Sequence, residues 1–325
     1  METVMTEQTQ PLESVLNEYE DKANAKTVFE RFGWALVALF GVWYASLFLI
    51  SFVIGVMEVK GIPAMTFYAR YMLFFNELTL AFGVVAAMLV MRSMPRCETV
   101  HETIGFKRFL QYIAIATALG MTGNLIGQVF LAFWNGATGN EAGGEVSELL
   151  LGSDGLSVFL MLCVVAPFLE EFLFRKVLID HTRKYGELVC ILTSGVLFGL
   201  FHGNFTQFFY AFGLGALLAH VYFKSGKFFV AFIFHVSFNI FFGVLPTIVL
   251  SKGSILSLVL YEFVYLSIVI TGIVLLIIEL QRFKPKKGEI SLPKKTMATA
   301  VMMNPGMIAA ILVMAVRMLH SLFTT

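Results

Sequence analysis

The chain has 325 residues, of which 58% are hydrophobic and 14% are charged, whereas soluble domains contain roughly 45–50% apolar residues. This excess predicts an integral membrane protein. The net charge of +1 argues against a basic nucleic-acid-binding surface, and three widely spaced cysteines argue against a disulfide framework or a CxxC metal site. The first 30 residues contain no short apolar run followed by small residues, so we expect no removable signal peptide.

Apolar segments in chain order predict transmembrane helices, which need about 20 mostly apolar residues. Eight are clear: 33–57, 71–91, 109–134, 156–175, 188–202, 205–223, 228–250 and 255–280. A polar tail, 1–30, precedes them, and a basic segment, 281–296, follows them. A ninth, weaker candidate lies within 297–325 and is interrupted by Asn304-Pro305-Gly306. We therefore predict an all-α fold, a polytopic transmembrane helix bundle over 31–280.

The positive charges predict a cytoplasmic N-terminus, because Lys and Arg concentrate in the cytoplasmic segments next to membrane spans. With the N-terminus inside, all but four of the 23 basic residues lie in inner segments, and the exceptions are Lys60, Arg70, Lys252 and Arg317. The Gly-rich outer loop 135–155 carries no basic residue. The tail 1–30 and the segment 281–296 are therefore expected in the cytoplasm.

Three predicted spans carry ionisable or amide side chains, which usually face a protein interior or a water-filled cavity when they lie within a bilayer. They are Glu170, Glu171 and Arg175 in FLEEFLFR, His202 at the end of FGLFH, and His235 and Asn239 in FHVSFN. Each of them is a functional candidate.

Helical geometry separates the two adjacent acids. Glu171 and Arg175 are four residues apart, so their side chains are neighbours and can form an ion pair. Glu170 is rotated by about 100° and lacks that partner. We interpret Glu171 and Arg175 as structural and Glu170 as the acid available for chemistry.

The three helices place these groups at similar depths if the fourth helix is long. When that helix continues to a turn at Gly186, Glu170 lies 16 residues before the turn and His202 lies 16 residues after it. Each distance is about 24 Å along a helix. Pro167, one turn before Glu170, is expected to loosen the backbone pairing of the helix.

A carboxylate, two imidazoles and an amide that meet in one pocket are suited to peptide hydrolysis. The carboxylate can act as a base, and His202 can share its proton or hold a water. His235 and Asn239 can donate hydrogen bonds to an oxyanion. Neither Ser237 nor Cys163 is placed to pair with a histidine, so a covalent nucleophile is disfavoured.

The three segments resemble the motifs of a known family. EEFLFR is similar to EExxxR, FGLFH to FxxxH, and FHVSFN to HxxxN. In this order they are the motifs of the CAAX prenyl endopeptidase and bacteriocin-processing family (CPBP, also called Abi), which are intramembrane proteases. The resemblance covers residues 170–239, within a motif core at 156–250, and the flanking spans agree only in being hydrophobic.

The resemblance implies an intramembrane endopeptidase that cleaves a membrane-associated peptide or protein, of the CAAX type or a leader peptide or bacteriocin. The implied catalytic residues are Glu170, which activates water, His202, which assists it, and His235 and Asn239, which stabilise the oxyanion; Glu171 and Arg175 give structural support. Glu170, His202 and His235 could also bind zinc. We favour a metal-free, glutamate-dependent mechanism and keep zinc dependence as the alternative.

A non-enzymatic hypothesis also stays open, namely a transporter or immunity protein whose polar cluster binds a proton or an ion. Transporters often have paired halves with broken helices, and the sequence shows no such pairing. The expected partners are the peptide or protein substrate and the lipid bilayer, with no nucleic acid. The short tail and compact loops resemble those of bacterial members, so we expect a multi-pass protein of the plasma membrane.

Overall fold

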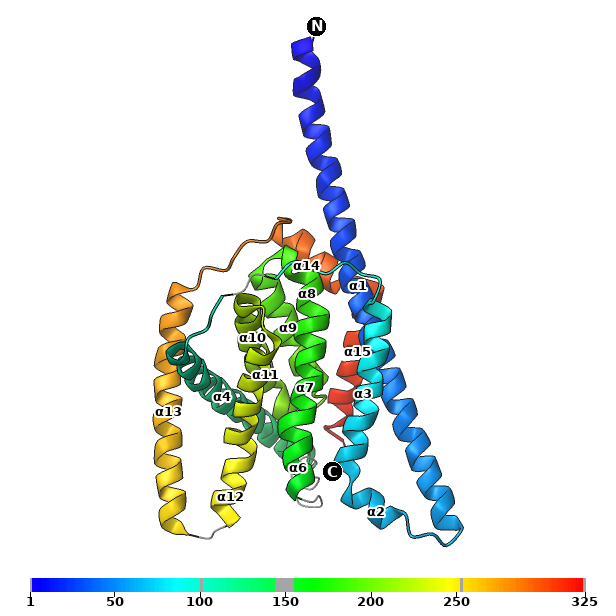
Figure 1. Ribbon diagram of the computed structural model, residues 1–325, viewed down its shortest axis with the longest axis vertical. Helices are drawn as coiled ribbons and strands as arrows, with labels where there is room; N and C mark the ends of the chain where they lie inside the picture. Colours follow the sequence, from blue (N-terminus) through cyan, green and yellow to red (C-terminus); the bar gives the residue numbers. More distant parts are fainter. Residues whose placement is uncertain (1, 100–101, 144–154, 252–253, 324–325) are drawn as a thin grey trace.

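The computed structural model describes residues 2–99, 102–143, 155–251 and 254–323, and within these ranges it contains helices and no strand (Figure 1). The predicted all-α class is confirmed. In chain order the elements are α1 (Glu2–Val59), α2 (Met65–Arg70), α3 (Met72–Met91), α4 (Phe106–Thr138), α6 (Gly155–Leu160), η1 (Met161–Val165), α7 (Ala166–Glu171), η2 (Phe172–Ile179), α8 (Asp180–Thr182), η3 (Arg183–Tyr185), α9 (Glu187–Phe201), α10 (Phe205–Ser225), α11 (Phe228–Asn239), η4 (Ile240–Val244), α12 (Leu245–Ser251), α13 (Ile255–Arg282), α14 (Lys294–Met302) and α15 (Pro305–His320).

Among the residues that the structure describes, five helices are long and apolar enough to cross a membrane. They are Leu16–Val59, Met72–Met91, Phe106–Thr138, Leu156–Tyr185 and Ile255–Arg282, and the bent pair α14 and α15 would make a sixth. The sequence predicted eight spans and a ninth, a number that the described helices do not confirm. One reason is length: α9 has 15 residues, about 22 Å of helix against a hydrocarbon core of about 30 Å.

The predicted polar tail and the first span form one helix, α1. Its 58 residues correspond to about 87 Å, nearly three times the thickness of a hydrocarbon core. The N-terminal part therefore extends beyond the bundle (Figure 1). Among the side chains that the structure describes, full burial begins at Ala25, so α1 packs against other helices from the end of the tail onward.

The helix that carries EEFLFR is long, as the depth argument requires. Residues 156–185 form a candidate span of 30 residues, about 45 Å in length. Two π-helical stretches, η1 and η2, flank the short α7. Pro167 lies at the start of α7 and lacks an amide N–H, which favours the wider turn before it. The chain then reverses at Gly186, whose φ of 100° favours glycine.

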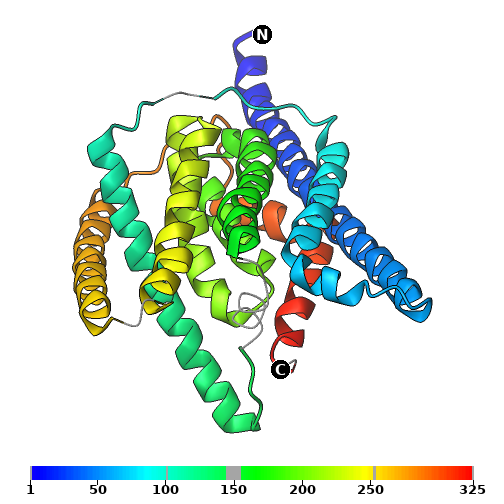
Figure 2. The same cartoon turned by 60° about the horizontal axis from the view of Figure 1, so that its bottom comes forward.

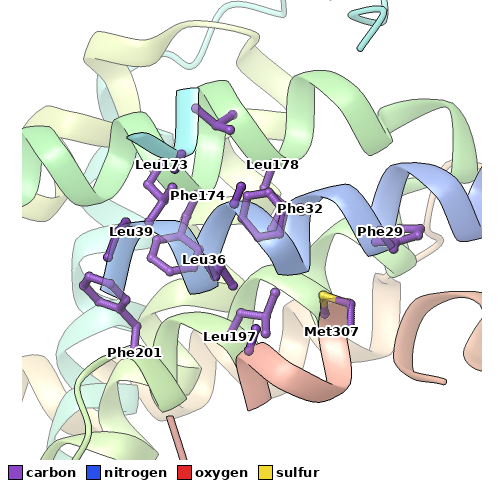
Figure 3. Packing of buried hydrophobic residues seen from close by; sticks show 14 of the residues in the cluster. Phe29, Phe32, Leu36, Leu39, Leu173, Phe174, Leu178, Leu197, Phe201 and Met307 are labelled. Atoms are coloured by element: carbon purple, nitrogen blue, oxygen red, sulfur yellow. The ribbon is translucent and has the colours of Figure 1, made fainter. Parts of the chain in front are cut away.

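Two hydrophobic cores flank the central helices α7, α9 and α11. One core joins α1, α3, η2, α9 and α15, and Phe32, Leu36, Phe174, Phe201 and Met307 belong to it (Figure 3). The other core joins α4, η2, α9, α10 and α11. The motif helices therefore lie between α1, α3 and α15 on one side and α4 and α13 on the other (Figures 1 and 2).

The ninth predicted segment is helical and is broken at the predicted place. α14 and α15 meet with a bend of 65°, and the Asn304 Oδ1 caps α15 by accepting a hydrogen bond from Met307 N at 2.8 Å. α15 also packs closely on α1, because a Cβ on Gly33 would lie 2.1 Å from the carbonyl carbon of Gly306. The C-terminal helix pair is thus an integral part of the bundle.

The predicted outer loop 135–155 begins later than expected, because α4 continues to Thr138. The helix ends at Gly139, which has a φ of 74°. Residues 144–154, the rest of this predicted loop, lie outside the described residues.

Candidate active site

Three helices bring the motif residues together inside the bundle. α7 carries Glu170 and Glu171, His202 follows the last residue of α9, and α11 carries His235 and Asn239. α11 packs against η1, α7 and η2, and α9 packs against η2. The three sequence motifs therefore contribute to one interior site.

The Glu171–Arg175 pair forms as the sequence predicted, and both side chains are fully buried. The Arg175 Nε lies 2.8 Å from Glu171 Oε2, and the Arg175 Nη2 donates a hydrogen bond to Glu171 Oε1 at 3.1 Å. The Arg175 Nη1 donates to Ser194 Oγ on α9 at 2.6 Å. Because both charges are removed from water, each depends on the other, and Arg175 connects η2 to α9.

His235 connects the two adjacent acids. Its Nδ1 lies 3.0 Å from Glu171 Oε1, which is a hydrogen bond, and its Nε2 lies 3.6 Å from Glu170 Oε2, which is too far for one. The side chain of His235 is 4% exposed and that of Glu170 is 13% exposed. The sequence assigned Glu171 to Arg175 alone; in the structure Glu171 also orients His235, whose second nitrogen then faces Glu170.

His202 is oriented by the backbone of its own helix. Its Nδ1 lies 2.8 Å from the carbonyl oxygen of Phe198. A carbonyl oxygen only accepts, so Nδ1 carries the hydrogen and the neutral ring has its lone pair on Nε2. The Phe198 ring lies against both imidazoles, with ring centres 5.0 Å from His202 and 5.7 Å from His235. Phe198, the first residue of FGLFH, therefore packs against both candidate catalytic histidines, and the Arg175 guanidinium lies 5.3 Å from its ring centre.

Asn239 binds a backbone carbonyl that a proline leaves available. In η1, Ala166 N–H bonds Met161 O, five residues earlier. The next donor in this pattern would be Pro167, which has no N–H, so the carbonyl of Leu162 lacks its partner. The Asn239 Nδ2 donates to this Leu162 oxygen at 2.7 Å. The side-chain amide has two N–H donors, and this bond uses one of them.

A third carboxyl group reaches the site from α3, which packs against α7. Glu77 is 4% exposed, and its Oε1 accepts a hydrogen bond from Asn76 Nδ2 at 3.1 Å. Its buried Oε2 has no hydrogen-bond partner among the described residues. Glu77 and Glu170 thus lie on two helices in contact, where like charges on both side chains would repel each other. In the sequence Glu77 stands out only as an ionisable residue of the second predicted span.

The three candidate zinc ligands, Glu170, His202 and His235, do not form a metal site in this structure. Within the described ranges, no three His, Cys, Asp or Glu side chains are arranged to hold a metal ion.

Comparison with known proteins places the motifs in a family. The family described as type II CAAX prenyl endopeptidase Rce1-like matches residues 152–241. This segment is Rce1-like. The match confirms the resemblance that the three motifs indicated, and it contains all of the candidate catalytic residues. No curated protein and no solved structure matches the chain.

The Rce1-like segment and the long apolar helices together support a general class, a membrane-embedded protease of the CAAX type. The Rce1-like match covers the helices from α6 to α11 and leaves out α1 to α4 and α12 to α15.

Several contacts of the site were not predicted from the sequence. Ser194 was missed, although a hydroxyl group in the apolar run of α9 was a visible signal. The Leu162 carbonyl was missed because a backbone group leaves no trace in composition, although Pro167 was a signal that some carbonyl would be free. Arg317 was predicted only as a charge of an outer segment, and its contacts with α9 and α1 were missed.

Proposed function

We propose that this chain is an intramembrane endopeptidase in which Glu170 activates a water molecule to hydrolyse a peptide bond. The placement of Glu170 carries the proposal: its carboxylate faces His235 Nε2 at 3.6 Å, while the neighbouring Glu171 is already bound to Arg175. The Rce1-like match supports the reaction class. One acid is thus available for chemistry within a site whose other acid is occupied.

The proposed reaction needs no covalent intermediate. Glu170 accepts a proton from water while the water oxygen attacks the peptide carbonyl carbon, and a tetrahedral oxyanion forms. The proton then passes to the amide nitrogen as the C–N bond breaks. The products are a new carboxyl terminus and a new amine, so atoms and charges balance.

The remaining polar groups position water and stabilise the oxyanion in this proposal. The lone pair of His202 Nε2 accepts a hydrogen bond from the attacking water. In this proposal His235 carries a hydrogen on both ring nitrogens: Nδ1–H binds Glu171, and Nε2–H donates to the oxyanion together with the second N–H of Asn239. Glu171 and the Leu162 carbonyl already hold these two side chains in place, so little reorganisation is needed during the reaction.

The proposed substrate is a peptide or protein associated with the membrane, either a prenylated CAAX sequence or a leader peptide. The site lies between helices of an apolar bundle, so a substrate anchored in the same bilayer is at high effective concentration. The CAAX type is supported by the Rce1-like match. We further propose a plasma membrane location of the bacterial kind.

The experiment is cleavage of a farnesylated CAAX peptide and of its unprenylated counterpart by the purified protein in liposomes, with the products identified by mass spectrometry. We expect release of the peptide that follows the prenylated cysteine. A Glu170→Gln protein, purified in parallel, is the background control, because this substitution would not reduce cleavage by a co-purifying protease. Equal cleavage by both preparations would reject the proposal.

Metal dependence is tested in the same assay. The metal-free mechanism predicts that cleavage persists after removal of divalent metals, with no stoichiometric zinc by elemental analysis. Stoichiometric zinc that is lost in His235→Ala, together with activity that returns only on addition of zinc, would establish the metal-dependent alternative.

A further inference from the structure

Arg317 is a charged residue in the apolar helix α15, far outside the Rce1-like segment. The described residues include no carboxylate that forms an ion pair with it. Arg317 is partly buried, and a cation in an apolar bundle without a counter-ion needs another source of stabilisation.

Its first contact is the end of α9. The Arg317 Nη1 donates a hydrogen bond to the carbonyl oxygen of Phe201 at 2.8 Å. Phe201 is the last residue of α9, where carbonyl groups lack partners within the helix. A positive charge at a helix C-terminus is favourable, so Arg317 both satisfies the carbonyl and stabilises the helix end.

The second contact lies on the other side of His202. Gly203 has a φ of 69°, and a Cβ built on it would lie 2.9 Å from the Arg317 guanidinium carbon. The guanidinium group therefore lies directly against the backbone of Gly203. Since it also binds Phe201, Arg317 contacts the residues immediately before and after His202.

The third contact is an aromatic surface on α1. The guanidinium carbon lies 4.9, 5.2 and 5.8 Å from the ring centres of Phe40, Trp43 and Tyr44. Cation–π contacts at these distances replace part of the lost hydration. Phe201 joins the same cluster, with ring centres 5.6 Å from Phe40 and 6.1 Å from Trp43. α1, α9 and α15 thus meet around one guanidinium group.

We propose that Arg317 is a positioning residue that holds the His202 turn in the orientation needed for hydrolysis. The inference rests on the proposed function. It extends the set of residues that support catalysis to α15 and α1, both of which lie outside the Rce1-like segment. Arg317 acts through the backbone on either side of His202 and does not contact the substrate, so its loss changes turnover and leaves substrate binding unaltered.

The test compares kcat and KM for farnesylated peptide cleavage by three variants at equal folded concentration. Arg317→Met keeps an unbranched side chain against the aromatic rings and removes the donor and the charge, and we expect kcat to fall about 10- to 100-fold because catalytic geometry is sensitive to shifts of about 1 Å. KM is expected to stay within about twofold of wild type under the same argument. Arg317→Lys, which retains a charged donor, is expected to recover most of kcat.

Arg108→Ala is the matched control. Like Arg317, Arg108 makes a cation–π contact, to Tyr112 at 4.7 Å, but it also forms an ion pair, with Glu279 at 2.6 Å, and lies on α4 away from the motif residues. We expect its kcat to match wild type.

Coupling to His202 separates positioning from a general structural role. In a His202→Ala protein with measurable residual activity, Arg317→Met is expected to cause no further loss of kcat, because the group it positions is already gone. The inference is overturned if Arg317→Met lowers the melting temperature but leaves kcat unchanged. It is also overturned if the kcat losses of His202→Ala and Arg317→Met multiply in the double variant. Should Arg317→Met fail to fold, Arg317→Gln, which removes the charge and shortens the side chain, decides through the same coupling. Full cleavage by Glu170→Gln would instead reject the proposed function.

Discussion

At the scale of single residues, the two adjacent glutamates differ in their surroundings more than in their chemistry. Glu171 is fully buried and contacts Arg175 and His235, whereas Glu170 keeps a small exposed fraction and no hydrogen bond to a described side chain. A buried acid bound on two sides holds its neighbours in place. An acid without such bonds is available to accept a proton from water.

Glu171→Gln is therefore expected to destabilise the protein far more than Glu170→Gln. Removal of the Glu171 charge leaves Arg175 buried without its partner, a loss of about 3–5 kcal/mol for a broken buried pair. Glu170→Gln is expected to unfold at nearly the wild-type temperature. Thermal unfolding of both variants in the same detergent checks the difference, and equal melting temperatures would contradict it.

At the scale of elements, π-helical turns determine which backbone carbonyls are available to side chains, and glycines determine how closely the helices approach. η1 frees the Leu162 carbonyl for Asn239, and η4 begins directly after Asn239. The peripheral helix α13 packs on α4 through Gly272, where a Cβ would lie 1.9 Å from the carbonyl oxygen of Ala114. Small residues at such contacts allow backbones in membranes to pack closely.

Gly272→Val is expected to separate α13 from α4, because the added side chain would overlap backbone atoms that cannot rotate away. We expect a loss of about 1–3 kcal/mol, the usual magnitude for overpacking. Gly55→Val is the control, since a Cβ there meets no atom within 4 Å. Melting temperatures of the two variants check the prediction, and equal values would show that the α4–α13 contact tolerates the side chain.

At the scale of the whole molecule, the orientation in the membrane is still a prediction from charge. The free Cys97 offers a direct probe, because it is partly exposed in the connection between α3 and α4, while Cys163 and Cys190 are buried. With the N-terminus inside, this connection lies in the cytoplasm.

A membrane-impermeant maleimide is therefore expected to label the protein in inside-out vesicles and not in intact cells. Cys97→Ser should abolish the labelling, because the remaining thiols are buried. Labelling in intact cells that disappears in Cys97→Ser would show that this connection lies outside the cell and would contradict the proposed topology.

The sequence was sufficient for the all-α class, the long fourth helix, the break at Asn304 and the Glu171–Arg175 pair, since each depends on local spacing or on proline chemistry. It was not sufficient for contacts between helices whose rotation about their own axes is set by packing. The bond between His235 and Glu171 and the contacts of Arg317 on either side of His202 are of this kind. The packing of α3, which carries Glu77, against α7 is a further example. The sequence also does not reveal that the Leu162 carbonyl lacks an N–H partner within its own helix, because this carbonyl belongs to the backbone.

The central claim is that Glu170 activates the water, and the most direct test is the single-turnover cleavage rate of Glu170→Gln in liposomes. Glu279→Gln, which changes an acid on α13 away from the site, is the matched control. Loss of a general base predicts a rate at least about 10²-fold below wild type for Glu170→Gln, with Glu279→Gln unchanged. A Glu170→Gln protein that cleaves within twofold of the wild-type rate would contradict the account.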